Sequence, residues 1–130
     1  MLDASGTICE ASAANVFFIK NERLVTPSIT RDIFPGITRE IIVNLAIENG
    51  IKVLETSIHV SQLGDFNGCF LCATLMEIVP VKSIDSYIYQ TESLPVFQKM
   101  QALFSEIISR WAVTPPSAQP PFFPQNDARI

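Results

Sequence analysis

One stretch of this chain constrains the fold more than any other: a helix pattern that ends at a glycine and leads directly into a strand pattern. Apolar residues recur at three- and four-residue spacing in "ITREIIVNLAIE", with Glu40, Asn44 and Glu48 on the opposite side. The apolar positions are Ile37, Ile41, Ile42, Leu45 and Ala46. Gly50 stands where helices commonly end in a left-handed residue, and residues 51–58, "IKVLETSI", predict a strand. A helix joined to a strand through one glycine favours an α+β or mixed α/β fold.

Further elements follow from the same kinds of pattern. Aromatic and β-branched residues predict strands over 15–20, 24–26, 69–73 and 76–84, and Asn21 with Glu22 predicts a tight turn between the first two. A second amphipathic helix runs from Ser93, as its N-cap, to residue 112. We expect one α+β domain over residues 1–112, with a mixed sheet and two main helices. The tail over residues 113–130 contains five prolines, and we expect it to be disordered.

Charge and hydropathy exclude several classes of function. The net charge is −4, and the nine basic residues are scattered along the chain, which argues against nucleic-acid binding. No apolar run has the length of a membrane span, and the first residues, "MLDASGTICE", do not resemble a signal peptide. We therefore expect a cytoplasmic protein without a membrane partner.

The cysteines and the single histidine offer a possible metal site. Cys69 and Cys72 have the spacing of a metal or redox pair, and Cys9 with His59 would complete four ligands. However, three residues apart on a strand places two side chains on opposite faces. Buried free cysteines are the alternative that we favour, with His59 at the surface and no metal bound.

Three further features could carry chemistry. In "FPGITRE", residues 34–40, Thr38 either caps the helix or joins the helix N–H groups in binding an anion. Glu10 lies just before a predicted strand, either solvated on a loop or paired with a cation. In "CATLME", residues 72–77, a threonine between two strands forms either a second anion site or an ordinary connection.

Taken together and in order, three segments resemble one family. They are "ICEASAANVFFIKNERLVTPSI", "FPGITREIIVNLAIENGIKVLE" and "FLCATLMEIVPVKSID". They resemble the fold-type-IV (class IV) aminotransferases, which depend on pyridoxal 5′-phosphate (PLP). This family includes branched-chain aminotransferases, D-amino acid aminotransferases and aminodeoxychorismate lyases. The resemblance implies the C-terminal part of the large domain of these enzymes, with strands of a mixed sheet or pseudo-barrel.

The resemblance also assigns roles to particular residues. Glu10 would bond the pyridine nitrogen of PLP, and the backbone amides of Ile37 and Thr38, with the Thr38 hydroxyl, would hold its phosphate. Thr74 would be a second phosphate-binding residue, and Thr74 with Leu75 would face the substrate carboxylate. Asn15 matches the motif as well, and we expect a supporting role for it.

One family feature is missing from this sequence. The lysine that forms the Schiff base with PLP lies on a strand upstream of the motif glutamate, and none of the nine residues before Glu10 is a lysine. We therefore expect the C-terminal portion of a longer or truncated enzyme, with no catalytic residue of its own and with PLP bound non-covalently or not at all. The expected parent reaction transfers an amino group between an amino acid, of branched-chain type, and a 2-oxo acid. The resemblance implies a homodimer. The alternative is a non-catalytic remnant that binds PLP or packs against a partner subunit.

Overall fold

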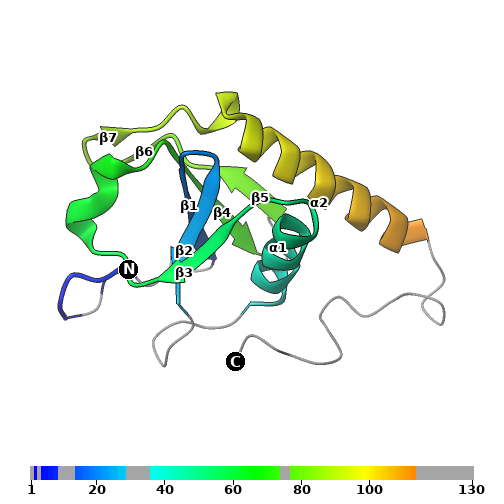
Figure 1. Cartoon of the computed structure of the whole chain (residues 1–130), viewed down its shortest axis with the longest axis horizontal. Coiled ribbons are helices and arrows are strands. Elements are labelled where there is room, and N and C mark those ends of the chain that lie inside the picture. Colours follow the sequence, from blue (N-terminus) through cyan, green and yellow to red (C-terminus); the bar gives the residue numbers. More distant parts are fainter. Residues whose placement is uncertain (1, 3, 9–13, 29–35, 74–76, 114–130) are drawn as a thin grey trace.

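The structure is a computed structural model, and it describes residues 2, 4–8, 14–28, 36–73 and 77–113 (Figure 1). Its main sheet contains β1 (Asn15–Lys20), β2 (Arg23–Pro27), β3 (Val53–Thr56), β4 (Gly68–Ala73) and β5 (Glu77–Pro80) in the order β3-β2-β1-β4-β5. Strands β2 and β3 are parallel, and the other neighbours are antiparallel. A separate hairpin pairs β6 (Ser83–Ile84) with β7 (Tyr87–Ile88).

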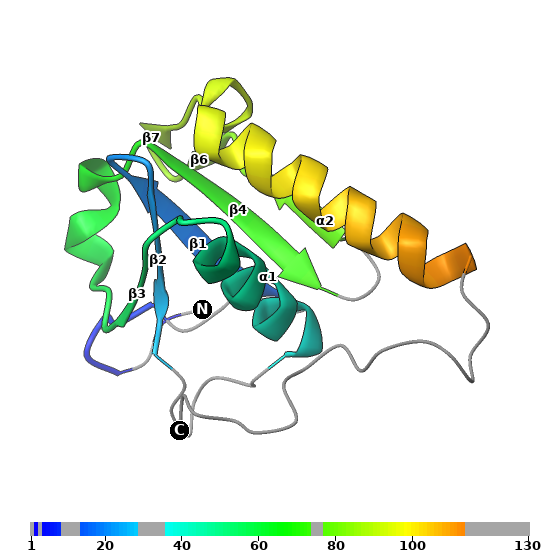
Figure 2. The ribbon, with the colours of Figure 1, turned by 45° about the vertical axis from the view of Figure 1, so that its right-hand side comes forward.

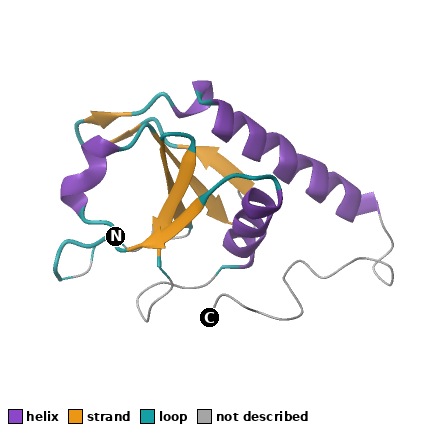
Figure 3. Ribbon diagram, in the orientation of Figure 1, coloured by secondary structure: helices purple, strands orange, loops and turns teal. Residues whose placement is uncertain are grey.

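Two long helices and two 3-10 turns complete the described chain. They are α1 (Ile37–Glu48), α2 (Pro95–Val113), η1 (Val60–Asp65) and η2 (Thr91–Ser93). Figure 3 shows both long helices on the same side of the sheet. The expected fold class, a mixed α/β arrangement with a mixed sheet and two main helices, is confirmed. Among the described helices, none combines the length and the apolar character needed to cross a bilayer.

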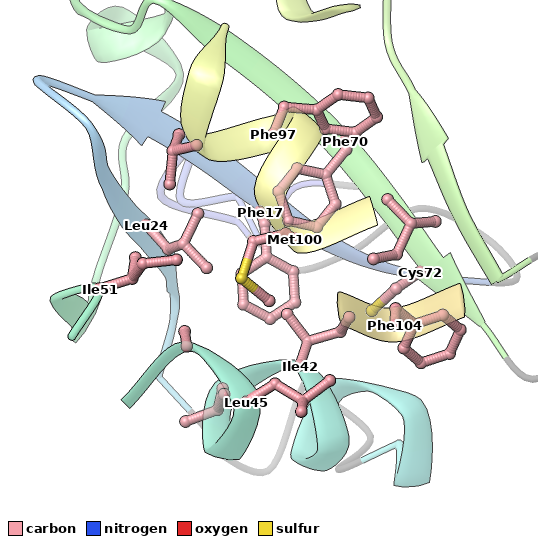
Figure 4. Packing of buried hydrophobic residues seen from close by; sticks show 14 of the residues in the cluster. Phe17, Leu24, Ile42, Leu45, Ile51, Phe70, Cys72, Phe97, Met100 and Phe104 are labelled. Atoms are coloured by element: carbon pink, nitrogen blue, oxygen red, sulfur yellow. The ribbon is translucent and has the colours of Figure 1, made fainter. Parts of the chain in front are cut away.

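Strand β1 is buried on both faces, and its successive side chains point in opposite directions into two clusters. In β1, Phe17 and Ile19 face α1 and α2, whereas Val16 and Phe18 face a second cluster with Leu63 of η1 and Tyr89, the residue after β7. Figure 4 shows the first cluster, where aromatic and aliphatic side chains of the sheet meet those of both helices. Phe17 stacks on Phe70 of β4, with ring centroids 5.1 Å apart.

Several element boundaries differ from the sequence predictions. The strand predicted over 76–84 is two strands, because Pro80 has no N–H for the ladder and Asp85 adopts a positive φ of 53° in the following hairpin. The strand predicted over 51–58 spans only Val53–Thr56. Ser93 is not the N-cap of α2; it lies in η2, and α2 begins at Pro95. Ile37 is 52% exposed and does not belong to the apolar stripe of α1.

The turn between β1 and β2 supports the start of α2. Asn21 and Glu22 both have positive φ, 51° and 60°, as a two-residue hairpin turn with primed geometry requires, so the predicted turn is confirmed. The Glu22 carboxylate accepts a hydrogen bond from the backbone N–H of Val96 at 3.0 Å. It thereby satisfies one of the first N–H groups of α2 and places a negative charge at the positive end of the helix.

Replacing this carboxylate should destabilise the protein. We expect Glu22→Ala to lower the free energy of unfolding by about 1 kcal/mol, the usual cost of losing a cap. Glu22→Gln keeps an acceptor and should cost less. Urea denaturation followed by circular dichroism measures both, with the exposed Glu48→Ala as the control. Equal stability of Glu22→Ala and the control would contradict this role.

Candidate functional site

Elements that flank all three predicted site segments meet at one end of the sheet (Figure 2). Asn15, the first residue of β1, is paired with Cys72 near the end of β4. Strand β2 runs antiparallel to β1 and ends at Pro27, so its end lies beside the start of β1. Because α1 also begins here, with Gly36 against Asn15, four chain segments converge at this sheet end.

The N-terminus of α1 is built without a side-chain cap. Its N-cap residue is Gly36, which has no side chain to accept a hydrogen bond, and Thr38 lies two residues inside the helix. Thr38 is therefore not the N-cap, so the structure does not support the capping interpretation of this residue. The first N–H groups of an α-helix have no acceptor within the helix, and such a terminus attracts anions.

Close packing explains the glycine at this turn. A Cβ atom built on Gly36 would lie 2.5 Å from Oδ1 of Asn15, which is closer than real contacts allow. Asn15 is itself only 8% exposed. The glycine therefore lets β1 and the start of α1 approach each other, and Asn15 lies beside this turn.

Arg39 is the residue at this site that the sequence predictions missed. Its side chain is 1% exposed, and Nη2 donates hydrogen bonds to the carbonyl oxygen of Pro27 at 3.0 Å and to Oε1 of Glu55 at 3.3 Å. Nε and Nη1 are buried and have no hydrogen-bond partner among the described residues. In the sequence, Arg39 was one of nine scattered basic residues, and its place beside the apolar stripe of α1 gave no sign of burial.

The predicted site residues are only partly covered by the structure. Ile37 is exposed and Thr38 is buried, both in the first turn of α1. Glu10, Thr74 and Leu75 lie outside the described residues, and their roles stay predictions. The same holds for the tail after residue 113.

Cys69 and Cys72 lie on opposite faces of β4. Cys69 packs in the cluster under η1, and Cys72 packs in the cluster under the helices, which confirms that they face opposite sides of the sheet. They therefore cannot share one ion. His59 caps η1: its Nδ1 accepts a hydrogen bond from the Ser61 N–H, and its Nε2 lies 3.1 Å from the carbonyl oxygen of Ser5. Within the described chain, no three His, Cys, Asp or Glu side chains are grouped as metal ligands.

The comparisons with known proteins agree with this geometry. Residues 1–84 match the family model described as Amino-transferase class IV. This chain belongs to the class IV aminotransferase family. The branched-chain-amino-acid aminotransferase of Salmonella typhimurium is 36% identical over 104 residues, which are 79% of this chain and 34% of that protein. This class IV chain thus spans about a third of that relative's length.

Solved structures of class IV aminotransferases superpose well on this chain. The branched-chain aminotransferase of Thermoproteus uzoniensis, solved with norvaline, is 34% identical with a TM-score of 0.77, over 83% of this chain and 36% of that one. An aminotransferase from Brucella abortus, solved bound to the cofactor PLP, is 25% identical with a TM-score of 0.74, over 80% and 36%. The fold of the described residues is therefore that of part of a class IV enzyme.

We expect Cys69 and Cys72 to be unreactive in the folded protein. Burial raises the pKa of each thiol from 9.0 to about 12, and the charge of Arg39 opposes this rise at Cys72. In a Cys9→Ser variant, a thiol reagent at pH 8 should label no cysteine before unfolding and two after it. Because folding raises both pKa values, the free energy of unfolding keeps its full contribution from these neutral thiols below pH 9. That contribution is lost as pH rises towards 12. Rapid labelling under native conditions would show that these thiols are accessible.

A second expectation concerns the contact of Gly36 with Asn15. We expect Gly36→Ala to lower the free energy of unfolding by about 1–3 kcal/mol, the usual cost of overpacking, because the added methyl group would meet the buried Asn15 side chain. In an Asn15→Ala background, the same substitution should cost less because the clashing Oδ1 is gone. A double-mutant cycle by urea denaturation measures this coupling. Additive effects would mean that the two residues do not limit each other.

Proposed function

We propose that this class IV chain forms the phosphate-binding part of a PLP-dependent aminotransferase site, at the N-terminus of α1. The convergence of α1, β1, β2 and β4 at one sheet end carries the proposal, because it brings the flanks of all three motif segments together. The relatives' names favour transfer of an amino group between a branched-chain amino acid and a 2-oxo acid.

The described residues fit a phosphate ester. The turn at Gly36 leaves the first N–H groups of α1 without a side-chain cap, and the Arg39 guanidinium adds a buried positive charge within the same helical turn. Both features attract a dianion. When bound, PLP would supply an electron sink that stabilises negative charge on the substrate. In this proposal, the amides of Ile37 and Thr38 and the Thr38 hydroxyl orient the cofactor through its phosphate.

The remaining assignments follow from the resemblance alone. Glu10 would hold a proton at the pyridine nitrogen, Thr74 would add to the phosphate contacts, and Leu75 would face the substrate carboxylate. In the sequence, Glu10 lies five positions before the first residue of β1, and Thr74 and Leu75 directly follow β4. Both attachment points lie at the sheet end where α1 begins. A homodimer is part of the same proposal.

The four lysines of the chain lie away from this sheet end. Lys20 is the last residue of β1, and a six-residue strand places it roughly 17 Å from Asn15. Lys99 contacts the carbonyl oxygen of Asn49, just after the opposite end of α1. Lys52 precedes β3, next to the end of α1, and Lys82 follows β5. We therefore propose that this polypeptide alone binds PLP without a covalent link and does not transfer amino groups.

A titration with and without the phosphate group tests this proposal. Absorbance changes on adding PLP to the purified chain should saturate, pyridoxal should bind at least tenfold more weakly, and borohydride should leave no adduct at a specific lysine. Thr38→Ala should weaken PLP binding by about tenfold through the lost hydrogen bonds. The control is Thr91→Ala, because the Thr91 hydroxyl bonds Cys69 N–H and Val81 O near the far end of β4.

Each alternative outcome has a distinct meaning. Equal affinity for PLP and pyridoxal would show that the α1 turn does not bind the phosphate. A single reduced lysine adduct would show that one of the four lysines does reach the cofactor. Weaker PLP binding in Thr91→Ala, to the same degree as in Thr38→Ala, would attribute both losses to general destabilisation.

A further inference from the structure

Arg39 is an anomaly in the core of this protein. It is the largest of the fully buried side chains in the described part of the chain, and it lies in the first turn of α1. Its Nε and Nη1 groups carry three N–H donors that have no acceptor among the described residues. A guanidinium cannot lose its charge in a protein, so burial cannot be relieved by deprotonation. Because removing a charge from water is costly, such a residue needs a compensating role.

The contacts that Arg39 does make connect two ends of one chain segment. Pro27 is the last residue of β2, and Arg39 is the third residue of α1, so the bond from Nη2 to the Pro27 carbonyl oxygen joins the exit of the strand to the entry of the helix. The second bond, to Glu55 on β3, fixes the same guanidinium to the neighbouring strand. Arg39 therefore fixes the end of β2 and the start of α1 relative to each other.

A simple structural ion pair does not account for this arrangement. The Glu55 side chain is 29% exposed and lies on an edge strand, where water could solvate it. Arg110, by comparison, forms its pair with Glu106 entirely at the surface, at 72% and 64% exposure. A partly exposed ion pair stabilises a protein little, whereas burying a guanidinium has a large desolvation cost. Arg39 lies one residue after Thr38, where it can fix the first turn of α1 beside the proposed phosphate site.

We propose that Arg39 is a positioning residue for the phosphate-binding turn: its guanidinium holds the first turn of α1 against the end of β2, so that the amides of Ile37 and Thr38 are preset for the phosphate. This inference rests on the function proposed above. The inference extends the proposed function, because it attributes the geometry of the turn to Arg39, a side chain to which the sequence predictions gave no role. Its buried charge also strengthens the positive end of α1.

The variants Arg39→Met and Arg39→Lys test this role, with Arg110→Met as the matched control. Met removes the charge and both Nη2 contacts. Lys keeps the charge, but its compact, strongly hydrated ammonium is costlier to bury than a guanidinium and does not reproduce the position of Nη2 between the two acceptors. We expect PLP to bind about tenfold more weakly to Arg39→Met, severalfold more weakly to Arg39→Lys, and with unchanged affinity to Arg110→Met.

Hydrogen exchange of the cofactor-free protein provides a second readout, which does not depend on binding. In Arg39→Met and in Arg39→Lys, the amides of Glu40 and Ile41, in the first turn of α1, should exchange about tenfold faster than in the wild type. The amides of β1 and β4 should keep their protection, because Met fills the site and the unpaired donors are gone. A merely structural role would instead raise exchange throughout the sheet.

The outcomes separate this inference from the proposed function. If the wild type binds no PLP, the proposed function fails, and the exchange data still decide whether Arg39 fixes the first turn of α1. Unchanged exchange at Glu40 and Ile41 in both variants would overturn the positioning role. If Arg39→Met does not fold, the Arg39→Lys variant decides alone: PLP affinity and exchange rates like those of the wild type would overturn the positioning role.

Discussion

Burial of β1 on both faces is the constraint on which the rest of this structure depends. Its residues from Asn15 to Ile19 are all buried, and alternate side chains enter two separate clusters. One face needs α1 and α2 as a cover, and the other needs η1, the 4–8 segment and the end of the β6–β7 hairpin. A strand covered in this way cannot shift register by one residue without exchanging its two faces, so the ends of the sheet are fixed as well.

The positions of the elements around the candidate site are fixed by this burial of β1. The start of β1 and the end of β4 are placed by their pairing, and α1 is placed by packing on the same sheet. The turn before α1 then needs only a residue without a side chain, which Gly36 provides beside Asn15. Burial of the Arg39 guanidinium carries a desolvation cost. The apolar packing on the helix-facing side of the sheet, including the stack of Phe17 of β1 on Phe70 of β4, offsets that cost.

Much of this fold could be read from the sequence, because it is encoded by local pattern. The stripe of α1, the Asn21–Glu22 turn and the strand in "NVFFIK" follow from periodicity and turn chemistry. The predictions that failed depend on contacts outside the local pattern: Ser93 joins η2, where its hydroxyl bonds the Gln90 carbonyl, and at the start of α1 Thr38 and Arg39 are buried while Ile37 is exposed. Arg39 could not be predicted at all, because its two partners, Pro27 and Glu55, come from strands on either side of α1 in the sequence.

The proposed phosphate binding and the covalent chemistry of such an enzyme place different demands on the fold. The proposed phosphate-binding turn is a local structure: one glycine, the first residues of one helix and one buried arginine within four positions. Covalent chemistry instead requires an amine at a point fixed by other strands, and every lysine in the chain is attached elsewhere on the fold. Although the net charge is −4, the sheet end at α1 combines a helix N-terminus with a guanidinium that cannot deprotonate. The positive charge that the proposed phosphate site requires is therefore present at this end of the sheet, whereas the four lysines lie elsewhere.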